Sequence, residues 1–234
     1  MRRLVVNADD FGQSPGINAG VIRSHEQGIV TSASLMVRWP ASEAAADYAA
    51  VHPELSVGLH VDLAEWSRAG GEWVARYRVV DDADPAAVEE EVRQQLQRFR
   101  DLLGRNPTHL DGHQHVQRSG HPARVLGELA TELGVVLRDR DPAVRYEGGF
   151  YGRTPDGPYP KGVTAGRLIE ILSGLPEGTT ELGCHPGLGS DVESDYAGER
   201  ALEVQALCDP RVRRASDRLG IELVSFAELA SPAS

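Results

Sequence analysis

Short hydrophobic runs alternate with amphipathic stretches along the whole chain of 234 residues. This alternation predicts a parallel sheet covered by helices, because parallel strands need long crossover connections and helices usually supply them. Helices are predicted at 15–27, 41–51, 86–103, 123–133, 163–173, 197–207 and 210–219. Seven strands are predicted, at 3–6, 30–37, 55–60, 108–111, 135–137, 180–184 and 222–224.

The chain is slightly short for a closed barrel of eight β/α units, which typically takes about 250 residues. We therefore predict a distorted or incomplete (β/α) barrel with a parallel sheet, and a doubly wound open sheet is the competing architecture. Linkers, repeats and low-complexity tracts are absent from the sequence, so residues 1–234 are expected to form a single catalytic domain. Segments 62–85 and 139–162 are predicted to be long loops of the kind that serve as lids or binding loops.

Composition limits the partners of the protein. The formal net charge of −11 argues against nucleic acid and other anionic polymers, and it favours a neutral or cationic substrate. The sequence lacks a run of ~20 apolar residues, so no membrane span is expected. The apolar run at 4–6 is too short for a signal peptide, which predicts a cytoplasmic location. The oligomeric state stays open, with a homodimer among the alternatives.

Aspartate and histidine residues recur at the ends of the predicted strands. Asp9 and Asp10 follow the first strand, His60 closes the third, residues 111–115 follow the fourth, and His185 follows a later one. The carboxyl ends of parallel strands open onto one rim, and active sites lie there. Four distant segments are therefore expected to converge on one cleft.

The adjacent carboxylates of Asp9 and Asp10 repel each other, and no Lys or Arg lies beside them in the sequence. A metal ion is the simple source of the positive charge that they need. Neighbouring side chains on a regular strand point to opposite faces, but a backbone turn at the strand end can present both. The alternative is that one of the two caps the following turn.

Three histidines and one aspartate fall within residues 108–115. On a strand His109, Asp111 and His113 would share one face, and His-rich tracts often bind metal. One of His113 and His115 is expected to be a ligand, and Asp111 is expected to orient a ligand imidazole. The alternative is a polar loop whose histidines are incidental.

His60 and His185 are the remaining candidates. His60 ends an apolar strand in which Gly58 permits a close backbone approach, and the alternative is a hydrogen-bonded core histidine. The Pro-Gly pair after His185 predicts a tight turn that faces the imidazole toward the rim. A Cys184 nucleophile is disfavoured, because adjacent strand residues point to opposite faces.

Two imidazoles and one carboxylate form a three-ligand site that leaves coordination positions open for water. Such a metal lowers the pKa of bound water and polarises a carbonyl oxygen. The ligand types admit zinc, manganese, cobalt, nickel or iron.

With these motifs the chain resembles the YdjC-like carbohydrate deacetylases, whose best-known members act on chitooligosaccharides. The matching segments occur in the order of the family and span most of the chain. They are residues 6–12 (VNADDFG), 28–34 (GIVTSAS), 58–60 (GLH), 107–116 (PTHLDGHQHV) and 184–187 (CHPG).

The resemblance implies a distorted (β/α) barrel with one divalent metal, and it adds magnesium to the candidates beside zinc. It implies Asp10, His60 and His113 as metal ligands, Asp9 as the base that activates water, and His185 as the general acid. Asp111 and His115 are left for indirect support of the ligands or for substrate contacts. Some family members carry a histidine where this chain has Gln117.

We therefore predict a metal-dependent hydrolase that removes N-acetyl groups from amino sugars or their oligomers and releases acetate. The alternatives are a hydrolase of a non-sugar amide and a non-catalytic metal- or sugar-binding protein. The spacing of Arg200 and Glu203 predicts only an ion pair on a solvated helix face. The aromatic residues of the two long segments could stack on sugar rings or pack the segments onto the barrel; they are Trp66, Trp73, Tyr77, Phe150, Tyr151 and Tyr159.

Overall fold

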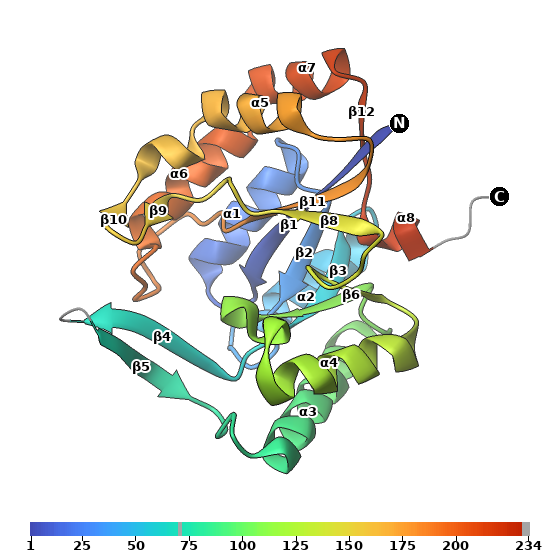
Figure 1. The fold of residues 1–234 in the computed structure, drawn as a ribbon, viewed down its shortest axis with the longest axis vertical. Coiled ribbons are helices and arrows are strands. Elements are labelled where there is room, and N and C mark those ends of the chain that lie inside the picture. Colours follow the sequence, from blue (N-terminus) through green and yellow to red (C-terminus); the bar gives the residue numbers. More distant parts are fainter. Residues whose placement is uncertain (70–71, 231–234) are drawn as a thin grey trace.

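The computed structural model describes residues 1–69 and 72–230, and its centre is a sheet of eight strands (Figure 1). The strand order is β7-β6-β3-β2-β1-β11-β8, with β12 paired to β1, and every pairing is parallel. The strands are β1 (Arg2–Phe11), β2 (Ser32–Leu35), β3 (Ser56–Val61), β6 (His109–Gly112), β7 (Val136–Leu137), β8 (Val144–Glu147), β11 (Gly178–Cys184) and β12 (Ile221–Leu223).

Helices lie around this sheet, which curls without closing, since β7 and β8 do not pair with each other within the described residues (Figure 1). The incomplete parallel barrel predicted from the sequence is therefore confirmed. The helices are α1 (Pro15–Glu26), α2 (Ser42–Val51), α3 (Pro85–Leu103), α4 (Gly120–Leu133), α5 (Ala165–Gly174), α6 (Ala197–Leu207), α7 (Pro210–Arg218) and α8 (Phe226–Ala230), with 3-10 turns η1 (His113–Arg118) and η2 (Pro160–Val163).

Local sequence signals account for several of these elements. Ser14 caps α1 by accepting a 3.1 Å hydrogen bond from the backbone N–H of Ile17, and Pro15 occupies the first helical position. The apolar stripe of α3 is buried, and Gly104 ends that helix in the left-handed region at φ 64°. Within the described residues, no helix is both long and apolar enough to cross a membrane.

The two predicted long loops are the main error of the sequence-based prediction. Segment 62–85 contains an antiparallel hairpin of β4 (Ala64–Ala69) and β5 (Glu72–Arg78), and segment 139–162 contains β8 and the short pair β9 (Arg153–Thr154) and β10 (Gly157–Pro158). The β5 side chains are exposed or half-buried along its whole length, so the strand lacks the buried alternating face by which strands are recognised.

His109 belongs to the core rather than to the rim. Its ring is fully buried, lies 4.1 Å from the ring of Phe226 between centroids, and places Nε2 3.1 Å from Ser34 Oγ. Gly58 on the neighbouring β3 permits this packing, because a Cβ at position 58 would lie 2.5 Å from the imidazole. The close approach predicted for Gly58 is thus confirmed, and its neighbour is a histidine ring. His113, which was expected on the same strand face, lies beyond the end of β6.

Gly58→Ala is therefore expected to reduce the free energy of unfolding by about 1–3 kcal/mol, because the buried ring of His109 must shift. Urea denaturation followed by circular dichroism measures this change. Gly127→Ala is the matched control, since a Cβ there would meet no heavy atom within 4 Å. In helix α4 the control is expected to stabilise by about 0.5–1 kcal/mol. Equal effects of the two substitutions would contradict the packing argument.

Candidate active site

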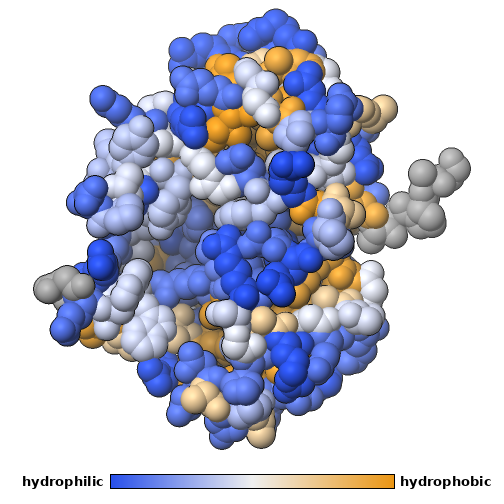
Figure 2. Space-filling model, in the orientation of Figure 1, coloured by the Kyte–Doolittle hydropathy of each residue, from blue (hydrophilic) through white to orange (hydrophobic). Residues whose placement is uncertain are grey.

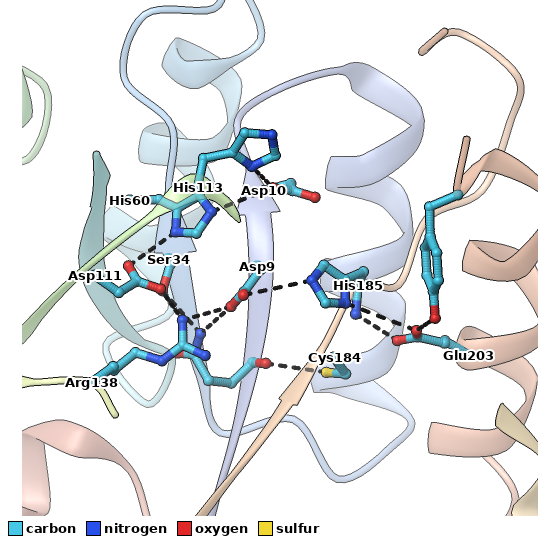
Figure 3. Close-up of polar contacts among 12 residues, drawn as sticks. Asp9, Asp10, Ser34, His60, Asp111, His113, Arg138, Cys184, His185 and Glu203 are labelled. Carbon is cyan, nitrogen blue, oxygen red and sulfur yellow. Dashed lines mark hydrogen bonds and ion pairs between the residues drawn. The ribbon is translucent and has the colours of Figure 1, made fainter. Parts of the chain in front are cut away.

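The side chains predicted to converge do so at the carboxyl ends of the strands (Figure 3). Asp9 and Asp10 lie at the end of β1, His60 near the end of β3, Asp111 near the end of β6, and His185 directly after β11. Because β6, β3, β2, β1 and β11 are consecutive in the sheet, these residues come together along one rim.

Asp10 adopts a left-handed backbone conformation with φ 65°, and the pairing of β1 with β2 shifts register between Ala8 and Phe11. This irregularity turns both neighbouring carboxylates toward the rim. The sequence analysis expected such a backbone turn at the strand end if both were to act at one site. The left-handed region is unfavourable for a residue with a side chain, and such conformations cluster at functional sites.

Asp10, His60 and His113 form a compact buried cluster whose donor atoms all lie within 4.8 Å of one another. Asp10 Oδ1 lies 3.4 Å from His60 Nε2 and 3.0 Å from His113 Nδ1, while the two rings meet edge to face. His113 Nε2 is buried without a hydrogen-bond partner in the described part of the chain. The donor set of one carboxylate and two imidazoles fits a divalent cation.

A second group of potential ligands, Asp9, His60 and Asp111, is equally compact. The guanidinium of Arg138 already lies against it, with Nη1 2.7 Å from Asp9 Oδ1 and in contact with Asp111 Oδ2. A metal ion there would be repelled by the guanidinium. In the Asp10 cluster a guanidinium contacts only Oδ2 and leaves Oδ1 facing the two imidazoles, so this cluster is the better candidate for a cation.

Arg138 is buried beneath the rim and contacts three carboxylates, those of Asp9, Asp111 and Glu181. Figure 3 shows its contacts with Asp9 and Asp111. Its Nε donates to Glu181 Oε1 at 2.6 Å. Burial opposes the charge of Asp9, but Arg138, His60 and His185 outweigh it and hold the pKa of this carboxyl below its ordinary value. Asp9 is thus kept ionised.

Asp10 is held by a second buried arginine. Arg200 Nη2 donates to Asp10 Oδ2 at 2.6 Å, which leaves Oδ1 for the two imidazoles. Burial opposes the charge of Asp10, but Arg200 and the hydrogen bond with His113 keep its pKa well below the usual range. The positive charge that the acidic pair needs is therefore supplied in part by two arginines that are distant in sequence.

His185 lies between two acidic residues. Its Nε2 is 3.7 Å from Asp9 Oδ2, and its Nδ1 is 4.0 Å from Glu203 Oε1. Burial lowers the pKa of His185 to about 4 and raises the pKa of Glu203 to about 8. Glu203 also accepts hydrogen bonds from the backbone N–H of His185 and from Tyr196 Oη, so it fixes the segment that carries the imidazole.

The sequence-based interpretation of Arg200 and Glu203 as a solvated ion pair is wrong. Arg200 is 6% exposed and Glu203 is fully buried, and α6 directs them at Asp10 and His185 respectively. Arg138 was also missed. Its only sequence signal is its position directly after the predicted strand 135–137, at the same rim as the other site residues.

Asp111 and His115 differ in their surroundings. Asp111 Oδ1 lies 3.0 Å from His60 Nδ1, although the two are not aligned as a hydrogen bond, and Oδ2 accepts from Ser34 Oγ at 3.2 Å. The imidazole of His115 packs edge to face on Tyr146 and lines the cleft. Of the two histidines, His113 is therefore the one near Asp10.

The thiol of Cys184 is buried and donates a 3.3 Å hydrogen bond to the Asn7 carbonyl oxygen. Burial raises the pKa of this thiol well above its usual value, which disfavours a thiolate. Figure 3 shows it on the far side of Asp9 from the histidine cluster.

The cluster forms the floor of a cleft of about 890 Å³. Figure 2 shows the surface hollowed between the β4–β5 hairpin and the segment of β9 and β10. Trp66, Trp73, Phe150 and Tyr151 line the cleft, so four of the six aromatic residues predicted to contact either a sugar or the barrel face this space. Tyr77 instead donates a 2.8 Å hydrogen bond to Asp62 Oδ1.

The fold is an incomplete parallel barrel, and the site at its rim is a buried Asp-His-His cluster. The chain belongs to the family of YdjC-like proteins, whose model matches residues 3–218. A carbohydrate deacetylase from Geobacillus stearothermophilus is 33% identical, with 97% of this chain and 98% of the relative covered. A chitooligosaccharide deacetylase from Serratia marcescens is 30% identical, with 97% of this chain and 98% of the relative covered.

A solved structure shares the fold over nearly its whole length. It belongs to a protein from Enterococcus faecalis V583 that is described as a candidate cellobiose-phosphate cleavage protein. The TM-score is 0.80 at 24% identity, with 98% of this chain and 99% of that chain covered. The incomplete barrel is therefore an architecture that this chain shares with a known protein.

Arg138→Met is expected to lower the free energy of unfolding by about 3–5 kcal/mol at pH 7.5, because it leaves three buried carboxylates without their cation. Without Arg138 the pKa values of these carboxyls in the folded state rise above the unfolded values. Protonation then favours the folded state, so the deficit shrinks as the pH is lowered toward 5. Urea denaturation at both pH values measures the difference.

The matched control is Arg118→Met, which removes a guanidinium 44% exposed at the rim that pairs with Asp139. A surface pair of this kind contributes about 0–1 kcal/mol. A loss as large as that of Arg138→Met, or a deficit of Arg138→Met that does not change with pH, would show that the buried network does not stabilise the fold in this way.

Proposed function

We propose that this chain is a metal-dependent hydrolase that removes N-acetyl groups from amino sugars or their oligomers and releases acetate. The observation that supports it most is the pairing of a buried Asp10-His60-His113 cluster with the flanking Asp9 and His185 at the floor of one cleft. Membership in a family with carbohydrate and chitooligosaccharide deacetylases among the relatives adds the substrate class.

Asp10, His60 and His113 are the proposed ligands of one divalent metal, which when bound supplies a Lewis acid for the acetamide carbonyl and for water. The set of two imidazoles and one carboxylate favours zinc over magnesium, because magnesium prefers oxygen ligands. Asp111, whose carboxylate faces the far nitrogen of His60, orients this ligand.

Asp9 is the proposed general base. Arg138 keeps its carboxylate ionised and fixed, so that it is ready to take a proton from the attacking water. His185 is neutral near pH 7, because burial lowers its pKa to about 4. His185 Nε2 lies 3.7 Å from Asp9 Oδ2, so the proton taken by Asp9 reaches the imidazole through one water or after the two atoms approach to hydrogen-bonding distance. His185 then protonates the departing amine.

The two alternatives make different demands on the cleft. A hydrolase of simple amides has no need of a volume of about 890 Å³ lined by six Trp, Tyr and Phe residues, which favours a sugar. A non-catalytic binding protein has no need of an ionised carboxylate and a neutral imidazole beside the ligand cluster. The proposal also includes residues 1–234 as one catalytic domain, since β1 and α6 from distant parts of the chain contribute to the same site. Cytoplasmic location and homodimer formation stay predictions.

Acetate release tests the function directly. The purified protein is expected to release acetate and a free amine from N-acetylglucosamine oligomers, to lose this activity in a chelator, and to regain it with an added divalent metal. Mass spectrometry of the glycans and an acetate assay measure the products. Release from simple amides but not from acetylated sugars would favour the first alternative, and metal binding without release from any acetylated sugar would favour the second.

Asp9→Asn is expected to lower kcat by about 10²–10⁴-fold, the range that general base catalysis contributes, and to leave metal content largely unchanged. Elemental analysis of the purified variant separates the two effects. Asp139→Asn is the control, since Asp139 is another rim carboxylate with an arginine partner but lies outside the cluster. Near-native turnover of Asp9→Asn on an acetylated sugar would remove Asp9 as the base.

A further inference from the structure

The β4–β5 hairpin forms one wall of the cleft. Its side chains Glu65, Trp66, Arg68 and Trp73 line the same space as the Asp10 cluster. The hairpin lies outside the main sheet and projects beside the rim, as Figure 1 shows. The hairpin is therefore an addition to the barrel. Its position shapes the cleft, and the main sheet forms without it.

Two contacts fix the hairpin to the site. The side-chain amide of Gln114, which directly follows His113, accepts a 2.9 Å hydrogen bond from the backbone N–H of Trp66 and donates a 2.8 Å bond to its carbonyl oxygen. At the base of the hairpin, Tyr77 Oη donates a hydrogen bond to Asp62 Oδ1. Gln114 makes its contact from a left-handed backbone conformation with φ 51°, so the loop that carries His113 is shaped around this bridge.

A third contact reaches across the cleft. Arg76 of β5 donates a 3.0 Å hydrogen bond to Asp195, which lies just before α6 and also lines the cleft. The wall is thus held from three directions before any ligand binds. A ligand binds to such a pre-organised wall without the entropic cost of ordering a mobile loop.

The hairpin presents two indole rings to the cleft. Trp66 pairs with Ala75 and Trp73 with Arg68, so all four residues share one face of the hairpin. Successive pairs on one face are roughly 7 Å apart, a spacing of the size of one pyranose ring. Trp73 is 65% exposed and Arg68 lies 5.8 Å from its ring, which leaves this large apolar surface unburied at the outer end of the cleft.

Polar groups complete the wall. Glu65 is largely buried and lines the cleft, and its carboxylate makes no hydrogen bond or ion pair within the described part of the chain. Gln13 Oε1 is buried in the same lining without a hydrogen-bond partner there. Unpaired buried acceptors beside aromatic faces suit a ligand that has hydroxyl groups at its edge and an apolar face.

We propose that the β4–β5 hairpin is a sugar-binding subsite, in which Trp66 and Trp73 stack on rings beyond the one that loses its acetyl group. This inference rests on the proposed deacetylase function and specifies its substrate as an oligosaccharide. The cleft of about 890 Å³ lies near the upper end of the ~300–1,000 Å³ that ligand pockets span, which leaves room for more than one ring.

The test is the dependence of kcat/KM on chain length, measured with N-acetylglucosamine and its dimer, trimer and tetramer. Trp73→Ala is expected to lower kcat/KM on the tetramer by about tenfold, mainly through KM, and to leave the monosaccharide within about twofold of wild type. Trp73→Phe keeps an aromatic face and is expected to retain most of the preference for longer chains.

Val74→Ala is the matched control, because Val74 is an exposed neighbour on the same strand that lies outside the described lining of the cleft. It is expected to behave as wild type on every chain length. An equal loss of Trp73→Ala on monosaccharide and tetramer, or no loss on either, would overturn the subsite. Sedimentation velocity adds a further check, since loss of self-association in Trp73→Ala with an unchanged chain-length profile would assign the exposed ring to an interface instead.

Calorimetric titration with the tetramer of N-acetylglucosamine separates this inference from the function on which it rests. The wild-type protein in chelator is expected to bind the tetramer, and Trp73→Ala to bind it about tenfold more weakly. Binding that depends on Trp73 without acetate release from any sugar would refute the deacetylase and leave the subsite intact. Acetate release together with tetramer binding that is unchanged in Trp73→Ala would refute the subsite and leave the deacetylase intact.

Discussion

The guanidinium of Arg138 is the contact on which the geometry of the rim depends. It joins three strands through Asp9 of β1, Asp111 of β6 and Glu181 of β11, all of them buried. Such a group tolerates burial only when every partner is in place, since removing one side of a buried pair leaves uncompensated charge. The arrangement of these three strands at the rim and the ionisation of Asp9 therefore depend on one network, and the rest of the site is arranged around a carboxylate that is already charged.

The adjacent acidic pair is divided between two cations. Asp9 faces Arg138 and Asp10 faces Arg200, so neighbours in sequence become separate electrostatic units in space. Only Asp10 Oδ1 is left facing His60 and His113. This division gives two identical side chains different surroundings, which is the difference that the proposed roles of Asp9 as base and Asp10 as metal ligand require. The left-handed backbone at Asp10 makes the division possible.

Sequence patterns predicted the parts of the structure that depend on interactions between residues close together in the chain. All seven predicted strands exist, and strand ends placed Asp10, His60 and His113 on one rim, because parallel strands share a direction. Strand β8 was missed because it is four residues long with a charged residue at two positions, and β5 because its side chains are exposed or half-buried along its whole length. The partners of Arg138, Arg200 and Glu203 could not be predicted, since a charged residue in a helix or loop has the same local pattern whether it meets solvent or a buried partner 190 positions away.

In the proposed function, chemistry and selectivity are carried by different structural units. The donor cluster stands on the ends of core strands, where packing fixes side chains closely, whereas the outer wall of the cleft is a hairpin that the sheet does not require. The two units meet at one amide, because Gln114 follows His113 and bonds the backbone of Trp66 on both sides. The strain of left-handed backbone at Gln114 and His115 is concentrated at this junction, where it is sustained by the contact it creates. A displacement of the hairpin would break the bonds of Gln114, so the position of the wall and the loop that carries His113 depend on the same contact.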